Sequence, residues 1–325
     1  MPAKVIDTTD AIVQRLRAIV QESPDLQHMA QVYEAILPLL RDADLRPALV
    51  SLTPEEARAK MELGLPLLHD LDLELDVESV HDLMLKLARA VETMKKKNQP
   101  YKFRLPWLQT SGKTDSAACR IRIVLEENKL DVGALLPHIA AGERGPVYSA
   151  AQNLELDPGL LMTLAQNALK PALRVWCLQL APLAKGIPWH KGTCYICGAA
   201  ATLGELQDND QIKHLRCGSC GADWQFRRLQ CMYCGNEDHK TQRYMHPGNH
   251  CERMHVEGCD ACKGYLKVIA AFTPTPPEML PAEDLATIHL DYIAKEHGYL
   301  RCAVSSELLD PKSFNQQNRS ECLFR

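Results

Sequence analysis

The chain has 325 residues, 46% of them hydrophobic and 24% charged, and its formal net charge is −4 at pH 7. This length and apolar content are enough for a substantial core and for two or more domains. No apolar run approaches the roughly 18 residues of a membrane span, and the charge balance lacks the basic excess typical of nucleic-acid-binding proteins. Composition therefore disfavours both of these classes.

The N-terminal half is predicted to be helical. Apolar residues recur at helical spacing, as in Ile12, Leu16 and Ile19, which is the pattern of an amphipathic helix. Residues 53–56 form a good helix start, because a capping threonine and a proline precede two acids near the positive end of the helix dipole. Further helices are expected over residues 10–21, 26–40, 80–94, 116–128, 131–141, 147–153 and 158–183.

Eight of the 13 cysteines form four Cys-x-x-Cys pairs between residues 194 and 262. The pairs fall into two couples, with 19 residues between the pairs of the first couple and 24 between those of the second. This is the spacing of two consecutive metal sites with four thiolate ligands each. The expected ligands are Cys194, Cys197, Cys217 and Cys220 for one metal, and Cys231, Cys234, Cys259 and Cys262 for the other.

Each pair is expected to lie on a tight turn that directs both sulfurs toward one point. Gly198, Gly221 and Gly235 directly follow their pairs, where a positive φ turns backbone N–H groups toward the thiolates. Gly264 follows one residue later, behind Lys263. Turn residues at 208–210 and 247–249 predict a hairpin within each unit. Units this small cannot bury a self-sufficient core, so the metal is expected to be part of the fold.

Other roles for the cysteines are less consistent with the sequence. The N-terminus carries no apolar signal stretch, which disfavours disulfides in an oxidising compartment, and a redox-active Cys-x-x-Cys normally occurs once. The remaining cysteines, Cys119, Cys177, Cys251, Cys302 and Cys322, are interpreted as buried or incidental thiols. A minority alternative has Cys251 or a neighbouring histidine replacing a thiolate, from His239, His246, His250 and His255.

The predicted fold class is α plus small β. A helical domain is expected over residues 1–188, two rubredoxin-like or zinc-ribbon modules over 189–228 and 229–275, and a C-terminal helix and tail over 276–325. The C-terminal helix is expected as one segment, 282–295, after a proline-containing connector. No Ser/His/Asp arrangement or other catalytic motif is present, so no catalytic residue is assigned.

The order and wording of these motifs resemble a known family, the formate dehydrogenase accessory protein FdhE family. The pairs read Cys-Tyr-Ile-Cys-Gly from 194, Cys-Gly-Ser-Cys-Gly from 217, Cys-Met-Tyr-Cys-Gly from 231 and Cys-Asp-Ala-Cys-Lys-Gly-Tyr-Leu-Lys from 259. A C-terminal Glu-Asp-Leu-Ala begins at Glu283, and His-Gly-Tyr begins at His297. The resemblance is close to about residue 300 and looser over the helical half. Lys263 departs from it, and the last 25 residues are given no role.

The resemblance implies a cytoplasmic maturation factor that is not an enzyme and that binds the catalytic subunit of a formate dehydrogenase before export. It also implies two iron ions, held as in rubredoxin by the eight paired cysteines. Spacing alone favours zinc, and zinc in one or both sites stays open because soft thiolates accept either metal. A rubredoxin-like electron carrier and a zinc-ribbon nucleic-acid-binding protein stay open as alternatives. Neither a nucleic acid nor membrane insertion is expected, and a homo-oligomer is left open.

Overall fold

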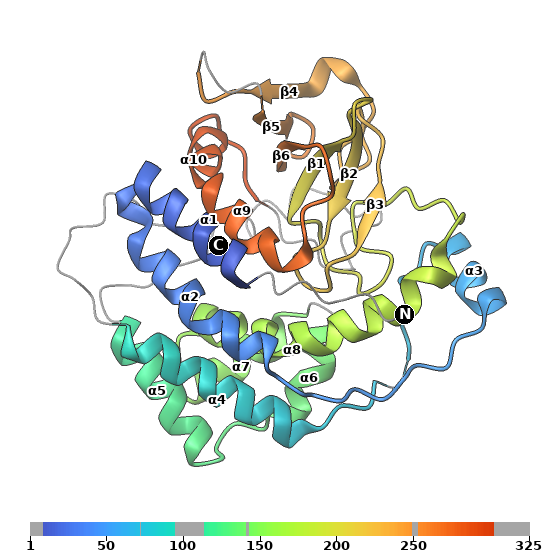
Figure 1. Ribbon diagram of the computed structural model, residues 1–325. Coiled ribbons are helices and arrows are strands. Elements are labelled where there is room, and N and C mark those ends of the chain that lie inside the picture. Colours follow the sequence, from blue (N-terminus) through green and yellow to red (C-terminus); the bar gives the residue numbers. More distant parts are fainter. Residues whose placement is uncertain (1–8, 72, 95–113, 141–142, 249–252, 302–325) are drawn as a thin grey trace.

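The computed structural model describes residues 9–71, 73–94, 114–140, 143–248 and 253–301. Helices dominate its N-terminal part, a single sheet follows, and two short helices come after the sheet, as Figure 1 shows. The N-terminal helices are α1 (Thr9–Glu22), α2 (Gln27–Arg41), α3 (Pro54–Glu62), α4 (Val77–Thr93), α5 (Thr114–Glu126), α6 (Val132–Ala140), α7 (Gly145–Asn153) and α8 (Pro158–Leu180). The predicted fold class is confirmed. The tail beyond residue 301 lies outside the described residues.

The helix starts and buried faces follow the sequence pattern. Thr53 and Glu56 form a capping box at α3, in which the Glu56 amide donates to the Thr53 hydroxyl at 3.3 Å and the Thr53 amide donates to the Glu56 carboxylate at 2.8 Å. On α4 the predicted apolar stripe is buried at Val80, Leu83 and Leu87. Within the described residues, no helix is both long and apolar enough to cross a membrane.

The sheet has six strands in the order β3-β2-β1-β6-β5-β4. They are β1 (Leu203–Gln207), β2 (Ile212–Arg216), β3 (Asp223–Gln225), β4 (Gln242–Met245), β5 (Met254–Cys259) and β6 (Tyr265–Ala271). The predicted hairpins are β1–β2 and β4–β5, both antiparallel. The two cysteine units are joined by β1 and β6, which pair in parallel with Gly204 opposite Val268. The sequence did not predict this junction. The boundaries drawn between the domains stay a prediction.

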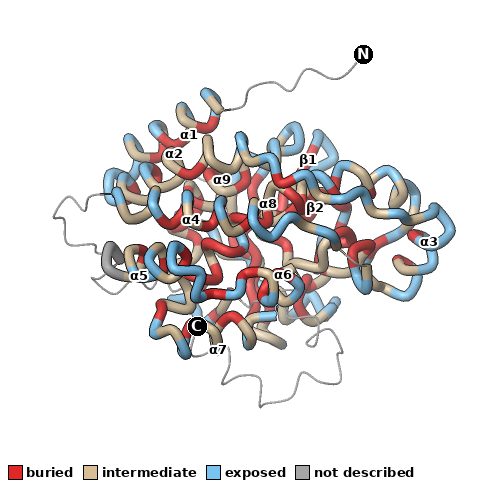
Figure 2. Tube along the Cα trace, turned by 90° about the horizontal axis from the view of Figure 1, so that it is seen from below, coloured by how far each residue is buried: buried red, intermediate tan, exposed pale blue. Residues whose placement is uncertain are grey.

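One hydrophobic core runs from the helices into the cysteine units. It includes Leu87 of α4, Trp176 of α8, the buried thiol of Cys217 and Tyr233. Figure 2 shows buried residues along α4 and α8 in the interior and exposed residues over much of α3. Backbone contacts add to this core, because the amides of Leu67 and Leu68 donate to the carbonyls of Tyr195 and Ile196. The first cysteine unit is therefore held by the helical part.

A second, smaller core joins the first two helices to the helices that follow the sheet. It contains apolar residues of α1, α2 and α9 (Leu280–Ala286), among them Leu16, Ala30 and Leu285. At its edge the Arg15 guanidinium binds the Glu283 carboxylate through two hydrogen bonds, of 2.7 and 2.9 Å. The N-terminal helices and the C-terminal segment thus fold as neighbours.

The C-terminal helix predicted over 282–295 is wrong as a single segment. The structure has two helices, α9 and α10 (Ile288–Glu296), which meet at Thr287. The buried Thr287 hydroxyl donates to the carbonyl of Glu283 at 2.8 Å. Such a bond from a threonine to the carbonyl four residues earlier bends helices, and here it coincides with the break.

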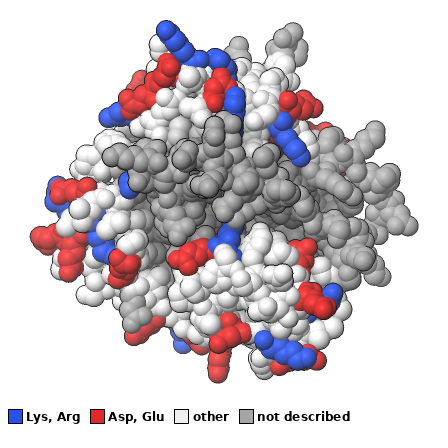
Figure 3. Space-filling view, turned by 180° about the vertical axis from the view of Figure 1, so that it is seen from behind, with Lys and Arg blue, Asp and Glu red and all other residues white. Residues whose placement is uncertain are grey.

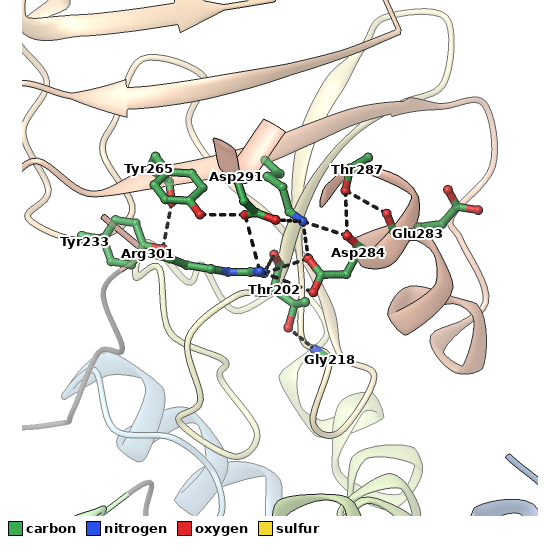
Figure 4. A network of polar contacts seen from close by, with 10 residues as sticks. Thr202, Gly218, Tyr233, Tyr265, Glu283, Asp284, Thr287, Asp291 and Arg301 are labelled. Carbon is green, nitrogen blue, oxygen red and sulfur yellow. Dashed lines mark hydrogen bonds and ion pairs between the residues drawn. The ribbon is translucent and has the colours of Figure 1, made fainter. Parts of the chain in front are cut away.

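Buried charges fix α9 and α10 to the sheet (Figure 4). Lys267 of β6 is 1% exposed and lies 2.7 Å from Asp284 and 2.8 Å from Asp291. Arg301 binds the same oxygen of Asp284 as Lys267, at 3.0 Å, and the Tyr265 hydroxyl donates to Asp291 at 2.6 Å. These ion pairs lower the pKa of Asp284 against the opposing effect of its burial. Two acids and two bases thus balance one another.

Replacing Lys267 by methionine is expected to destabilise the protein by about 3–5 kcal/mol, because it leaves Asp284 and Asp291 buried with too little positive charge. Urea unfolding of the metal-loaded protein measures the change. Lys86→Met, at a position where Lys86 pairs with Asp82 on the exposed face of α4, should stay within about 0.5 kcal/mol of wild type. Equal losses in the two variants would contradict the role of the buried charges.

Candidate metal centres

The four Cys-x-x-Cys turns share one backbone geometry. In each turn, the amide of the residue that directly follows the second cysteine donates to the carbonyl of the first cysteine. The amide of the first cysteine donates in return to the carbonyl of the next residue along the chain. The first set of bonds is Gly198→Cys194 (2.9 Å), Gly221→Cys217 (2.9 Å), Gly235→Cys231 (3.0 Å) and Lys263→Cys259 (2.7 Å). The return bonds, to Ala199, Ala222, Asn236 and Gly264, are 2.8–2.9 Å long. Each turn is thus closed twice.

Three of the turns use the predicted glycine, and the fourth does not. Gly198, Gly221 and Gly235 have φ values of 77°, 82° and 70°. At the fourth turn the expectation for Gly264 is wrong, because Lys263 itself takes the positive φ, at 60°. Its ammonium binds Asp260 at 2.7 Å, which helps to hold a conformation that L-residues disfavour. The fourth turn therefore keeps the same hydrogen bonds as the others.

The turns bring the eight paired thiols into two groups of four. Within each group all four sulfurs lie within 4.8 Å of one another, so each group can hold a metal ion. In the first group the sulfurs of Cys194 and Cys220 are 3.4 Å apart, and those of Cys197 and Cys217 are 3.6 Å apart. The corresponding distances in the second group are 3.7 Å for Cys231–Cys262 and 3.8 Å for Cys234–Cys259.

These distances match the geometry of a tetrathiolate site. A tetrahedron with metal–sulfur bonds of about 2.3 Å places its sulfurs about 3.8 Å apart. Backbone amides also point at the thiols, with Ile196 N to Cys194 Sγ at 3.4 Å, Cys220 N to Cys217 Sγ at 3.5 Å and Gly264 N to Cys262 Sγ at 3.4 Å. Donors placed in this way stabilise negative charge on sulfur.

Hydrogen bonds within each group favour the thiolate at some of its cysteines, and in the second group a bond with Cys231 lowers the pKa of Cys234. Hydrogen bonds from Cys194, Cys197 and Cys220 lower the pKa of Cys217. In the second group the pKa of Cys259 is lowered in the same way by its three partners. Both residues begin the second turn of their couple, and a thiolate rather than a thiol is the form that binds metal.

The two groups differ in exposure. Three of the four thiols in the first group are buried and Cys197 is half-buried, whereas the second group has two half-buried members, Cys234 and Cys262.

The aromatic residues near the turns are core residues. Tyr195 and Trp224 are buried and pack edge to face at 6.2 Å, and the Tyr233 hydroxyl donates to the carbonyl of Tyr265.

Neither group contains a histidine among the described residues. The rings of His246 and His255 contact each other at a tilt, with centroids 5.4 Å apart, and neither residue belongs to a thiol group. Cys119 is half-buried beside Arg122, and Cys177 is buried. His250, Cys251, Cys302 and Cys322 lie outside the described residues.

The sequence did not indicate the contribution of α8 to the first group. Cys177 contacts the Cys220 thiol, and this contact lowers the pKa of Cys177 while its burial opposes the shift. Arg174 lies against Gly221, with its Nη1 atom 2.6 Å from the position of an added Cβ. Lys170, one turn earlier, lies near Cys217. The sequence places Lys170, Arg174 and Cys177 on one face of a predicted helix, but it does not show that this face packs against the first thiol group.

Comparison with known proteins adds to this geometry. The C-terminal domain of FdhE matches residues 229–309. A Protein FdhE homolog of Pseudomonas aeruginosa is 26% identical over 269 residues, which cover 79% of this chain and 76% of the relative. The resemblance to the FdhE family is confirmed. A second Protein FdhE homolog, from Stutzerimonas stutzeri, is 32% identical over 149 residues, which cover 45% of this chain and 48% of the relative.

A solved structure shows a similar fold. The crystal structure of the FdhE protein from Pseudomonas aeruginosa has a TM-score of 0.57 to this chain at 22% sequence identity. The match covers 94% of this chain and 97% of the other. The order of helical part, cysteine units and C-terminal helices is therefore that of an FdhE structure.

Two glycines at equivalent turns are expected to respond differently to alanine. Gly235 has open space, with the nearest atom 4.0 Å from an added Cβ, whereas at Gly221 that Cβ would lie 2.6 Å from both Arg174 Nη1 and Pro277 Cβ. Gly235→Ala should cost about 1–2 kcal/mol for its positive φ, and Gly221→Ala about 1–3 kcal/mol more for overpacking. Urea unfolding of both metal-loaded variants tests this, and equal costs would contradict the contact with α8.

Proposed function

We propose that this protein is a maturation factor of the FdhE type, which binds the catalytic subunit of a formate dehydrogenase in the cytoplasm and carries a metal ion at each thiol group. The observation that carries the proposal is the pair of four-thiol groups joined by one sheet in a chain that resembles FdhE. The chain acts, on this proposal, by recognising another protein rather than by transforming a small molecule.

The proposed ligands are the eight paired cysteines, and the proposed metal is iron in both sites. The sulfur spacing and the amides directed at sulfur fit a metal bound as in rubredoxin. Iron bound there would supply one-electron chemistry. The same donor set accepts zinc, so zinc in one or both sites is the outcome that metal analysis must separate from iron.

Access to the metal sites supports a role in contact with a partner. Cys197 of the first group and Cys234 and Cys262 of the second are half-buried. A partly exposed thiol ligand would bring the metal within reach of a docked protein. A purely structural site has no need of such exposure. The same exposure would serve an electron carrier, so the experiment on the partner must distinguish these two functions.

The charges around the second group are paired, which does not favour a nucleic-acid-binding role. Arg227 binds Glu237 at 2.7 Å, and Arg243 and Lys263 both bind Asp260. Figure 3 shows basic and acidic side chains next to one another on the described surface of the face that it presents. A surface that grips phosphates would instead gather cations that lack acidic neighbours.

Two metal ions per chain are expected after anaerobic purification, measured by elemental analysis against protein concentration. Replacing Cys194 and Cys197 by serine should leave one, because only the second group keeps four thiols. Cys119→Ser, which changes a thiol outside both groups, should leave two. Ferric iron would give visible thiolate charge-transfer absorption, and zinc would give none. A wild-type chain with one ion or none would contradict the two-site proposal.

Co-purification with the client tests the function. The tagged chain is expected to retain the formate dehydrogenase catalytic subunit from its own host, and loss of the gene should abolish formate oxidation while the subunit is still made. A Cys194→Ser, Cys197→Ser variant should fail to restore activity, whereas Cys119→Ser should restore it. Unchanged formate oxidation without retention of the subunit would reject the maturation role and favour the electron carrier.

A further inference from the structure

One face of α8 lies against the first thiol group. Leu173, Trp176 and Cys177 of α8 share a hydrophobic core with Cys217 and Cys220. Lys170, Arg174 and Cys177 are spaced four and three residues apart, so their side chains lie on one face of the helix. Arg174 contacts the turn at Gly221, directly after Cys220. The helix thus presents two cations to the second turn of the first group.

Lys170 is a half-buried cation without an ion-pair partner among the described residues. Burial lowers its pKa, and the charges that oppose this effect are Cys217 and then Asp284. Asp284 is already bound by Lys267 and Arg301. Lys170 shares one face of α8 with Arg174, which contacts the turn at Gly221, so the first thiol group is the neighbouring negative charge that is left for Lys170.

Arg174 has an acidic partner, but a loose one. Its Nε lies 3.6 Å from a carboxylate oxygen of Glu278, and both side chains are partly exposed. Water screens such a pair strongly, so Glu278 holds Arg174 only weakly.

The second group has a different environment. The cations around it, Lys263 and Arg243, both bind Asp260, at 2.7 and 2.8 Å. Lys213, beside Cys231 and Cys259, is paired with Glu257. Each of these cations has a close acidic partner, although Lys263 and Arg243 share one carboxylate, whereas at the first group Arg174 has only a distant one.

We propose that Lys170 and Arg174 are the counter-cations of the first thiol group, and that they make an iron ion bound there easier to reduce. This inference rests on the proposed metal sites. Reduction adds one electron to the metal from an external one-electron donor and breaks no bond. Four thiolates leave one net negative charge with ferric iron and two with ferrous iron, so a nearby cation stabilises the reduced form more.

The experiment uses the full chain loaded with iron, whichever metal is native. Redox titration with viologens as one-electron donors, followed by charge-transfer absorption, should show two one-electron steps. The step that persists in a Cys231→Ser, Cys234→Ser variant belongs to the first group.

Replacing Lys170 and Arg174 by methionine should disfavour reduction of the first group about tenfold, a fall of about 59 mV for a one-electron couple. The step of the second group should stay in place. The matched control is Lys86→Met with Arg89→Met, which removes the same charge from the exposed face of α4 and should move neither step.

Glu278→Gln tests the sign without removing a cation. It frees Arg174 from its acidic partner, so the potential of the first group should rise, and a purely structural role for α8 would not produce this opposite shift. Two steps that stay fixed, or that move together in every variant, would overturn the proposal. Wild-type protein that binds no iron would overturn the metal sites themselves, a failure that the metal count shows before any potential is measured.

Discussion

The parallel pairing of β1 with β6 is the contact on which the arrangement of both thiol groups depends. β1 follows the first cysteine turn and β6 follows the fourth, while β2 and β5 lead into Cys217 and Cys259. Because β1 and β6 point the same way, all of these turns lie at one end of the sheet. Gly192, two residues before the first turn, also packs against the third turn. The backbone of Met232 there leaves room only for a glycine.

That end of the sheet is held by two different kinds of interaction. On one side the core of α4 and α8 packs against the first group, and this contact is mainly hydrophobic. On the other side Lys267 and Arg301 bind the acids of α9 and α10, and this contact is electrostatic and specific in direction. Hydrophobic packing thus holds the first thiol group against the helices, and buried ion pairs hold the sheet against α9 and α10.

Local features of this fold were predictable from the sequence, and the contacts between distant segments were not. The cysteine turns, the Thr53 cap and the β1–β2 hairpin depend on residues within one turn or hairpin of each other. The β1–β6 junction depends on strands far apart in the chain, each short and individually ordinary. The helix break at Thr287 coincides with a hydrogen bond from its side chain to the Glu283 carbonyl, and an ion pair with Asp260 helps to hold the positive φ of Lys263. A hydrophobic pattern predicts neither interaction. For the same reason the thiol groups followed from the sequence, whereas the cations of α8 beside them did not.

The β1–β6 pairing also sets the order in which the protein is assembled on the ribosome. Gly204 and Val268 are paired neighbours in the sheet but lie more than 60 residues apart in the chain, so the sheet cannot close until nearly all of it has been synthesised. The first four cysteines emerge well before that, when the β1–β2 hairpin has only the helical part to pack against. A metal captured at this stage would hold the hairpin until β6 arrives.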